Sequence, residues 1–124
     1  MLQPGDYCGF EVAMRDPGIA VVTFNTPERL NGMTSALKRD LTEVVRQVQM
    51  DDDARVLVFT GSGRAFCAGD DISGHAAYEL MKPTVVPEIH PGHHNATGTY
   101  NGLRWMSQAL NTAVRDLDKI TIAS

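Results

Sequence analysis

Cysteines, basic clusters and long apolar runs are all scarce in this sequence of 124 residues, and each shortage argues against a class of protein. Cys8 and Cys67 are too few for a disulfide framework and lack the spacing of a zinc site, so we expect reduced thiols in a cytoplasmic protein. Apolar runs such as Ile19–Val22 and Val56–Phe59 reach at most four residues, whereas a membrane-spanning helix needs about 20. The first residues show no basic region followed by an apolar one, which argues against a secretory signal.

Positive charge is also limited. Eleven Lys and Arg residues stand against fifteen Asp and Glu residues, the net charge is −4, and no segment concentrates the basic ones. We therefore expect neither nucleic acid nor a membrane as a partner. No Gly-Lys-Ser/Thr phosphate loop is present, and Gly61 and Gly63 lack the third glycine of a dinucleotide-binding fingerprint.

The hydrophobic content of 43% is that of a folded chain, and its first half reads as a hairpin followed by a helix. Two segments rich in apolar residues, Phe10–Arg15 and Ile19–Phe24, flank the turn residues Asp16, Pro17 and Gly18. Thr34 or Ser35 can cap a helix whose apolar face repeats with the helical period. That face comprises Leu37, Leu41, Val44, Val45 and Val48, and polar residues from Lys38 to Gln47 fill the other face.

The second half continues the alternation of strand and helix. The acidic residues Asp51–Asp53 are interpreted as a solvated turn, and Val56–Thr60 as a strand covered on both faces. Apolar spacing predicts a helix over Leu103–Leu117, and Ile120–Ala123 reads as the beginning of a buried strand. This order predicts an α/β fold with a layer of helices on a sheet.

The segment Phe66–Ile72 (Phe-Cys-Ala-Gly-Asp-Asp-Ile) is the strongest candidate for chemistry. Its small residues let the backbone approach a ligand closely, and free N–H groups there could face one. The long irregular stretch after it holds four histidines, which we interpret as loop residues and not as a metal site: His75, His90, His93 and His94. A lid role for His75 stays open, and Trp105 either packs against the loop or lines an acyl pocket.

Three segments together resemble the enoyl-CoA hydratase/isomerase (crotonase) family. Phe24–Met33, Val56–Ile72 and Lys119–Ser124 occur in the family's order and with plausible separations. The resemblance implies an α/β fold built as a crotonase-like spiral of β-β-α units. It also implies acyl-CoA as the substrate, no further cofactor, no metal, and a homotrimer or a dimer of trimers.

The resemblance further implies an oxyanion hole made of two backbone N–H groups, one of them from the residue that matches Ala68. Such donors stabilise the negative charge that develops on a thioester oxygen, and one of them is typically worth about 10²–10³ in rate. We expect the Ala68 N–H to point into a cleft between the two matching segments. The substrate-binding residues implied are Arg29, Leu30, Gly32, Phe66, Ala68, Gly69, Asp70, Asp71 and Ile72, with Arg29 near the CoA phosphates.

Two positions depart from the family pattern, and both have mainly backbone roles, so we expect little effect. Gly32 stands where the family mostly has Ala, and Asp70 stands where Ala or Gly is more common. Asp71 matches the acidic residue of the motif, and a loop or helix-capping carboxylate is favoured over direct chemistry.

The resemblance stops at Ser124, before the glycine-rich loop and the carboxylates that the family pattern places next, and Glu79 and Glu88 match no catalytic position. We interpret residues 1–124 as the N-terminal part of a single crotonase-like domain, truncated before the second oxyanion-hole loop. The full-length protein would hydrate a 2-enoyl-CoA or isomerise its double bond, whereas this chain alone would be inactive. A non-catalytic acyl-CoA-binding or assembly subunit and an inactive fragment stay as alternatives. An unpaired last strand would make the isolated chain prone to associate.

Overall fold

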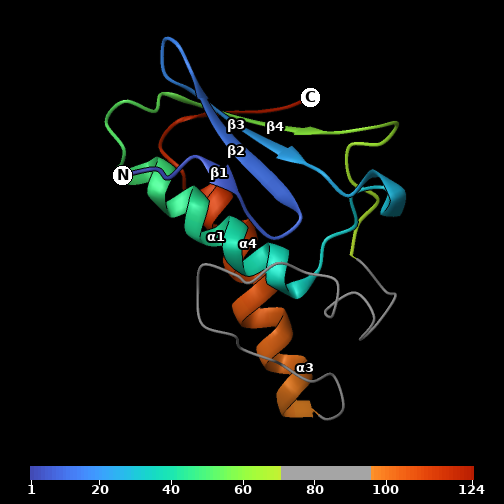
Figure 1. Cartoon of the computed structure of the whole chain (residues 1–124). Coiled ribbons are helices and arrows are strands. Elements are labelled where there is room, and N and C mark those ends of the chain that lie inside the picture. Colours follow the sequence, from blue (N-terminus) through green and yellow to red (C-terminus); the bar gives the residue numbers. More distant parts are fainter. Residues whose placement is uncertain (71–95) are drawn as a thin grey trace.

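The computed structural model describes residues 1–70 and 96–124, and a five-stranded sheet forms its upper layer with helices beneath it (Figure 1). The strands lie side by side in the order β1-β2-β3-β4-β5. Antiparallel pairing joins β1 to β2 and β2 to β3, and parallel pairing joins β3 to β4 and β4 to β5. The bounds are Gly5–Asp6 for β1, Phe10–Arg15 for β2, Ile19–Phe24 for β3, Val56–Gly61 for β4 and Ile120–Ala123 for β5.

The predicted hairpin is confirmed. Strands β2 and β3 pair over their whole length, from Phe10 opposite Phe24 to Arg15 opposite Ile19. The Gly18 N–H closes the turn by donating to the Arg15 carbonyl at 3.0 Å, and Gly18 has a φ of 118°, which favours glycine. The short strand β1 adds to the other edge of β2 and carries no pattern that would have predicted it.

Helix α1 (Ser35–Met50) connects β3 to β4 and supplies one side of the core. The Thr34 hydroxyl, one of the two caps that the sequence allows, accepts a hydrogen bond from the Leu37 N–H at 3.1 Å. The predicted apolar face is buried against the sheet residues Leu57 and Phe59, which confirms the expected packing. Each of its five side chains is at most 1% exposed, and burial of one such side chain stabilises the fold by about 1.5–3 kcal/mol.

The polar face of α1 is less exposed than the sequence predicts. Lys38, Asp40 and Thr42 are all buried, because the N-terminal segment and the C-terminal helix cover parts of this face. The Cys8 N–H donates to Asp40 Oδ2 at 3.3 Å.

Burial, with a smaller contribution from the Asp40 carboxylate, raises the pKa of the Cys8 thiol to about 11. Cys8 is therefore a protonated core thiol, and both it and Cys67 are free of disulfides.

The acidic turn after α1 is anchored at Asp51, so the prediction of a solvated turn is wrong for this residue. Asp51 is 7% exposed, and its Oδ2 and Oδ1 accept hydrogen bonds from the N–H groups of Leu2 and Asp53, both at 2.9 Å. These backbone donors, Leu2 foremost, hold the pKa of Asp51 below its usual value of 3.8. The Lys119 ammonium also donates to the carbonyls of Val48 and Asp51, which ties the approach to β5 to the end of α1.

Substitution Asp51→Asn should lower the free energy of unfolding at neutral pH, because an amide accepts more weakly than a carboxylate. The folded pKa lies below 3.8, so the stabilisation is complete above 3.8 and is lost as the pH falls through the folded value. Urea denaturation at neutral pH and in acid should show a difference between the two proteins that closes on acidification. Asp52→Asn, at the exposed neighbour, is the control, and a difference independent of pH would contradict the assignment.

Strands β4 and β5 are more exposed than the sequence predicts. Leu57 and Phe59 are buried, but Val56 and Val58 on the other face are half-buried, so β4 is not covered on both faces. Strand β5 is exposed along its length, with Ile122 at 46%, although it was expected to be buried. It pairs with β4 on one side, and among the described strands its other edge is open, as the sequence predicts. The cause is that helices cover only one face of the sheet in the described part of the chain (Figure 1).

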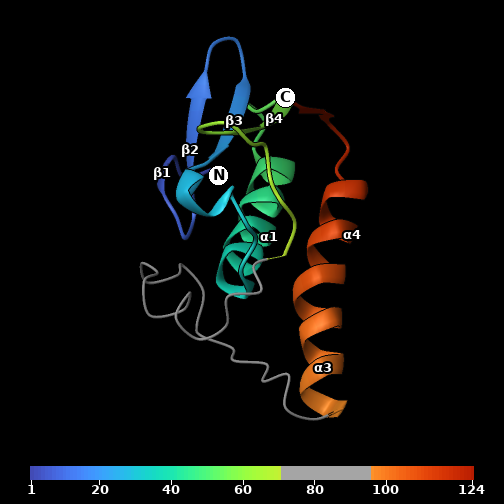
Figure 2. The same ribbon diagram turned by 90° about the vertical axis from the view of Figure 1, so that its right-hand side faces the viewer.

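The C-terminal helical rod consists of α3 (Ala96–Gly102), the π-helix η2 (Leu103–Gln108) and α4 (Ala109–Arg115), and it runs beside α1 (Figure 2). A helix is predicted here, but it begins at Ala96 and not at Leu103. In η2 the Ala109 N–H donates to the carbonyl of Arg104, five residues back, which widens the turn. Leu103 is consequently 51% exposed, whereas Leu110 is buried as expected. No helix in residues 1–70 or 96–124 is long and apolar enough to cross a membrane.

Candidate functional site

The two segments that the sequence singled out lie side by side where β3 and β4 end. The Ala68 N–H donates to the Leu30 carbonyl at 3.0 Å, and the Met33 N–H donates to the Gly69 carbonyl at 2.8 Å. Met33 and Asp70 form an isolated parallel bridge at this point. The expected juxtaposition of Arg29–Gly32 with Phe66–Ile72 is therefore present as far as Asp70, where the described residues end.

Asn31 fastens these two segments together from inside the protein. It is fully buried, and its Nδ2 donates to the carbonyls of Ser62 at 3.0 Å and Ala65 at 2.8 Å. Its Oδ1 accepts from the Thr26 N–H at 3.0 Å. The backbone of Asn31 has a φ of 57°, a conformation that asparagine tolerates better than most residues. One side chain thus fixes the loops that follow both β3 and β4.

Gly61, the last residue of β4, permits a close approach of this loop. A Cβ atom at this position would lie 2.5 Å from the Phe66 carbonyl oxygen and 2.8 Å from Asn31 Nδ2. These distances are far inside van der Waals contact, and one of the atoms is backbone. The glycine is therefore required for the path of the 62–66 loop.

The expectation that the Ala68 N–H faces a cleft is wrong, because this N–H is bonded to the Leu30 carbonyl. The Gly69–Asp70 peptide, two peptides further along the chain, is oriented so that its N–H points the other way. The only cis peptide of the described residues is Asp16–Pro17, so the Gly69–Asp70 peptide is trans. In a trans peptide the C=O and N–H groups point in opposite directions. Since the Gly69 carbonyl points at Met33, the Asp70 N–H points away from that segment, and no described residue accepts a hydrogen bond from it.

Gly69 causes this change of direction. Its φ of 110° lies in a region that residues with a side chain rarely adopt, and nothing lies within 4 Å of where its Cβ would be. Ala68, Gly69 and Asp70 are all exposed. The result is an accessible peptide whose carbonyl accepts a hydrogen bond from Met33 and whose N–H points away from Met33.

The remaining predicted residues lie on the two segments that meet here or outside the described chain. Arg29 ends the 3-10 turn η1 (Pro27–Arg29) and is half-buried, and the buried Gly32 donates its N–H to the Arg29 carbonyl at 3.1 Å. Phe66 is 42% exposed and meets Phe24 edge to face at 5.7 Å. The predictions that fall outside the described residues concern Asp71, Ile72, His75, Glu79, Glu88, His90, His93 and His94.

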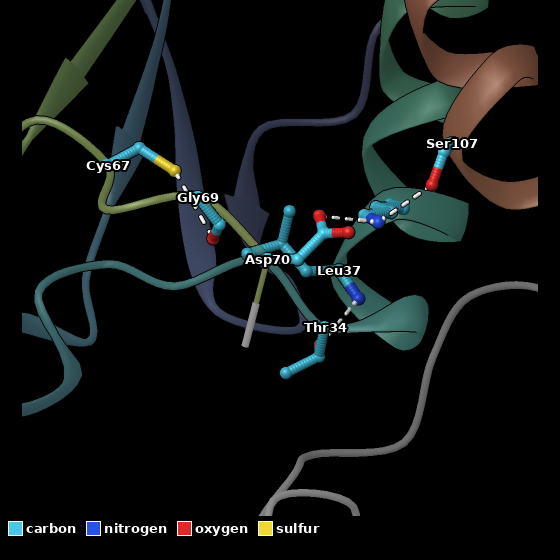
Figure 3. A network of polar contacts seen from close by, with 7 residues as sticks. Thr34, Leu37, Cys67, Gly69, Asp70 and Ser107 are labelled. Carbon is cyan, nitrogen blue, oxygen red and sulfur yellow. Dashed lines mark hydrogen bonds and ion pairs between the residues drawn. The ribbon is translucent and has the colours of Figure 1, made fainter. Parts of the chain in front are cut away.

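Charge at the site comes from an ion pair that sequence reasoning missed. Lys38 Nζ lies 2.7 Å from Asp70 Oδ1 and donates to the Ser107 hydroxyl at 2.9 Å. Figure 3 shows the Asp70 carboxylate and the Ser107 hydroxyl converging from opposite sides on the first turn of α1. Cys67 is near, with its Sγ 3.9 Å from the Gly69 carbonyl oxygen. The helical period predicts only that Lys38 lies on the polar face of its helix. No pattern in the sequence indicates that it pairs with Asp70 on a distant loop.

Trp105 is 61% exposed, and the Arg104 guanidinium lies over its ring at 5.5 Å. The ring lines an open groove of about 460 Å³ between α1 and the C-terminal helical rod, together with Val45, Arg46, Gln49 and Gln108. The proposed packing against the irregular loop involves residues outside the described chain. Among the described residues, those that line the groove do not include Asp70 or its neighbours in the loop.

The hairpin, the α1 crossover and the outward-facing peptide after β4 together define an α/β protein of the crotonase fold. The solved structure of the enoyl-CoA hydratase from Bacillus anthracis superposes with a TM-score of 0.71 at 22% identity, over 93% of this chain and 38% of that one. Residues 14–124 match the family model described as Enoyl-CoA hydratase/isomerase, and the chain belongs to that family. The family and fold predicted from sequence are thus confirmed.

Curated relatives align with only part of this chain. The protein named "Probable enoyl-CoA hydratase 1, peroxisomal" from Arabidopsis thaliana is 40% identical over 82 residues, 65% of this chain and 30% of that protein. The 1,2-epoxyphenylacetyl-CoA isomerase of Escherichia coli is 43% identical over 58 residues, 47% of this chain and 22% of that protein. The chain thus matches less than a third of the length of either relative.

Proposed function

We propose that residues 1–124 form the N-terminal, thioester-binding part of a crotonase-family enzyme, and that the complete enzyme hydrates a 2-enoyl-CoA. The observation that carries this proposal is the Asp70 N–H, which points outward from a peptide held by Met33 on its other side. We assign the oxyanion donor to Asp70 in place of Ala68. Below, the full-length enzyme means this chain continued through the second oxyanion-hole loop.

The chemistry follows from where charge develops in the reaction. Addition of water to a conjugated thioester places negative charge on the carbonyl oxygen, and a fixed N–H donor stabilises that charge more than it stabilises the substrate. The donor must be held in place beforehand, and the hydrogen bonds of Ala68, Gly69 and Asn31 do this. The small Ala68 and Gly69 let a thioester approach the backbone. The groups that move protons belong to the part of the enzyme beyond Ser124.

Isomerisation of the double bond is the second candidate, because the family model that matches residues 14–124 is described as Enoyl-CoA hydratase/isomerase. Both reactions place charge on the same oxygen, so the Asp70 peptide serves either. We also propose a homotrimer or a dimer of trimers in the cytoplasm. Support for assembly comes from the large apolar side chains that are exposed on the C-terminal rod and β5: Tyr100, Leu103, Trp105, Ile120 and Ile122.

The substitution Arg29→Ala tests acyl-CoA binding by this surface. Arg29 lies on the loop bonded to the Ala68 segment, where a positive charge can meet the CoA phosphates. A partly solvated charge contact contributes about 1 kcal/mol to the free energy of binding, so its loss should raise the Kd for the acyl-CoA about fivefold. Titration calorimetry of the purified protein with butyryl-CoA, which has no double bond to hydrate, measures the affinity.

Arg15→Ala is the matched control, because Arg15 is exposed at the other end of β2 and β3. Equal affinity of the Arg15 and Arg29 variants would remove Arg29 from the site, and absence of binding by the unmodified protein would refute the proposed function. We expect residues 1–124 alone to bind the ligand without hydrating crotonyl-CoA. An inactive fragment would do neither, whereas a non-catalytic binding subunit would stay inactive even in its full-length form.

A further inference from the structure

Lys38 is a buried cation with an acidic partner on the candidate site. Its side chain is 9% exposed, whereas that of its partner Asp70 is 66% exposed. A buried ammonium group is costly unless it is paired and hydrogen-bonded. Asp70 Oδ1 at 2.7 Å and the Ser107 hydroxyl at 2.9 Å supply these two interactions.

The position of Lys38 is unfavourable for the helix itself. Lys38 follows the N-cap Thr34 by four residues, and its N–H donates to the Thr34 carbonyl at 3.0 Å, so it lies in the first turn of α1. The helix dipole disfavours cations at this end. The helix dipole therefore gives no reason for a positive charge here, whereas the tertiary contacts with Asp70 and Ser107 do. Ser107 belongs to the π-helix η2, a type of turn that is frequent at functional sites.

We propose that Lys38 is a positioning residue for the oxyanion site, and this inference rests on the function proposed above. The Gly69–Asp70 peptide is held on its carbonyl side by Met33, and the Lys38 ion pair holds it through the Asp70 side chain. The ammonium also neutralises a carboxylate that belongs to the same residue as the donor N–H. Without Lys38 that carboxylate would repel the negative charge developing on the thioester oxygen.

The double-mutant cycle of Lys38→Met and Asp70→Ala in the full-length enzyme tests the inference. Lys38→Met leaves the carboxylate unpaired, and we expect kcat for crotonyl-CoA to fall about 10–100-fold with KM changed less than about threefold. The double variant lacks both charges and should return to the kcat of Asp70→Ala alone. Lys38→Arg should recover part of the activity because it keeps the positive charge. Arg115→Met, which removes the surface pair with Asp116, is the control and should match the unmodified enzyme.

A second measurement does not depend on turnover. A hydrogen bond to the thioester oxygen lowers the stretching frequency of the carbonyl, and infrared difference spectra with carbonyl-labelled butyryl-CoA should show a smaller shift in Lys38→Met. Ser107→Ala, which removes only one hydrogen bond of Lys38, gives a milder variant should Lys38→Met unfold. A double variant as impaired as Lys38→Met, with an unchanged carbonyl frequency, would reduce Lys38 to a structural role. Failure of the unmodified enzyme to bind butyryl-CoA would instead refute the proposed function, and this inference with it.

Discussion

Substitution Asp70→Pro in the full-length enzyme should lower kcat about 100–1000-fold, the effect expected for loss of one oxyanion donor. Proline has no N–H, and the residue before it, Gly69, has no Cβ for the ring to meet. The Gly69 carbonyl can still accept from Met33, so the loop keeps its attachment. Steady-state kinetics with crotonyl-CoA measures the change, and KM should change much less than kcat.

Asp70→Ala is the matched control, because it removes the same carboxylate and keeps the N–H. We expect it to lose no more than about tenfold in kcat, the effect of imperfect positioning alone. Equal activity of the proline and alanine variants would show that the Asp70 N–H does not contact the reacting oxygen. The carboxylate or the loop path would then explain the loss.

Substitution Asn31→Ala should lower the free energy of unfolding by about 2–4 kcal/mol. The change removes three hydrogen bonds of a fully buried side chain and leaves two carbonyls and one N–H without their partner. It also places alanine at a φ of 57°, which asparagine tolerates better. Urea denaturation followed by circular dichroism measures the loss.

Two further variants separate these causes. Asn31→Gly relieves the backbone conformation but not the lost hydrogen bonds, so it should recover only the smaller part of the loss. Asn25→Ala, at an exposed asparagine in the same loop, should leave stability within about 0.5 kcal/mol of the unmodified protein. An Asn31→Ala variant as stable as Asn25→Ala would mean that Asn31 does not fasten the two loops.

Local patterns in the sequence were sufficient for the hairpin, α1 and β4. Thr34 is the cap because its hydroxyl can reach the Leu37 N–H, and the apolar period of α1 names the five side chains that the sheet buries. No such pattern marks the beginning of the C-terminal helical rod at Ala96. Residues Ala96–Gly102 include two glycines and bury only Gly102, and the π-turn then moves Leu103 out of the period that predicted its burial.

The candidate site could be located from the sequence but not oriented. The motif identified the Phe66–Asp70 backbone as the surface that meets a ligand, yet the direction of each N–H depends on the φ of Gly69 and on the bond from Ala68 to Leu30. The Lys38–Asp70 pair depends on how α1 lies against a loop more than 30 residues away along the chain. Asn31 was part of the recognised motif, but its role requires the positions of Ser62 and Ala65.

A crystal structure of the full-length enzyme with bound butyryl-CoA would test the central claim most directly. We predict that the thioester oxygen lies about 2.7–3.1 Å from the Asp70 nitrogen, with the Ala68 N–H still bonded to Leu30. A thioester oxygen bonded to the Ala68 nitrogen, or placed away from the Gly69–Asp70 peptide, would contradict it.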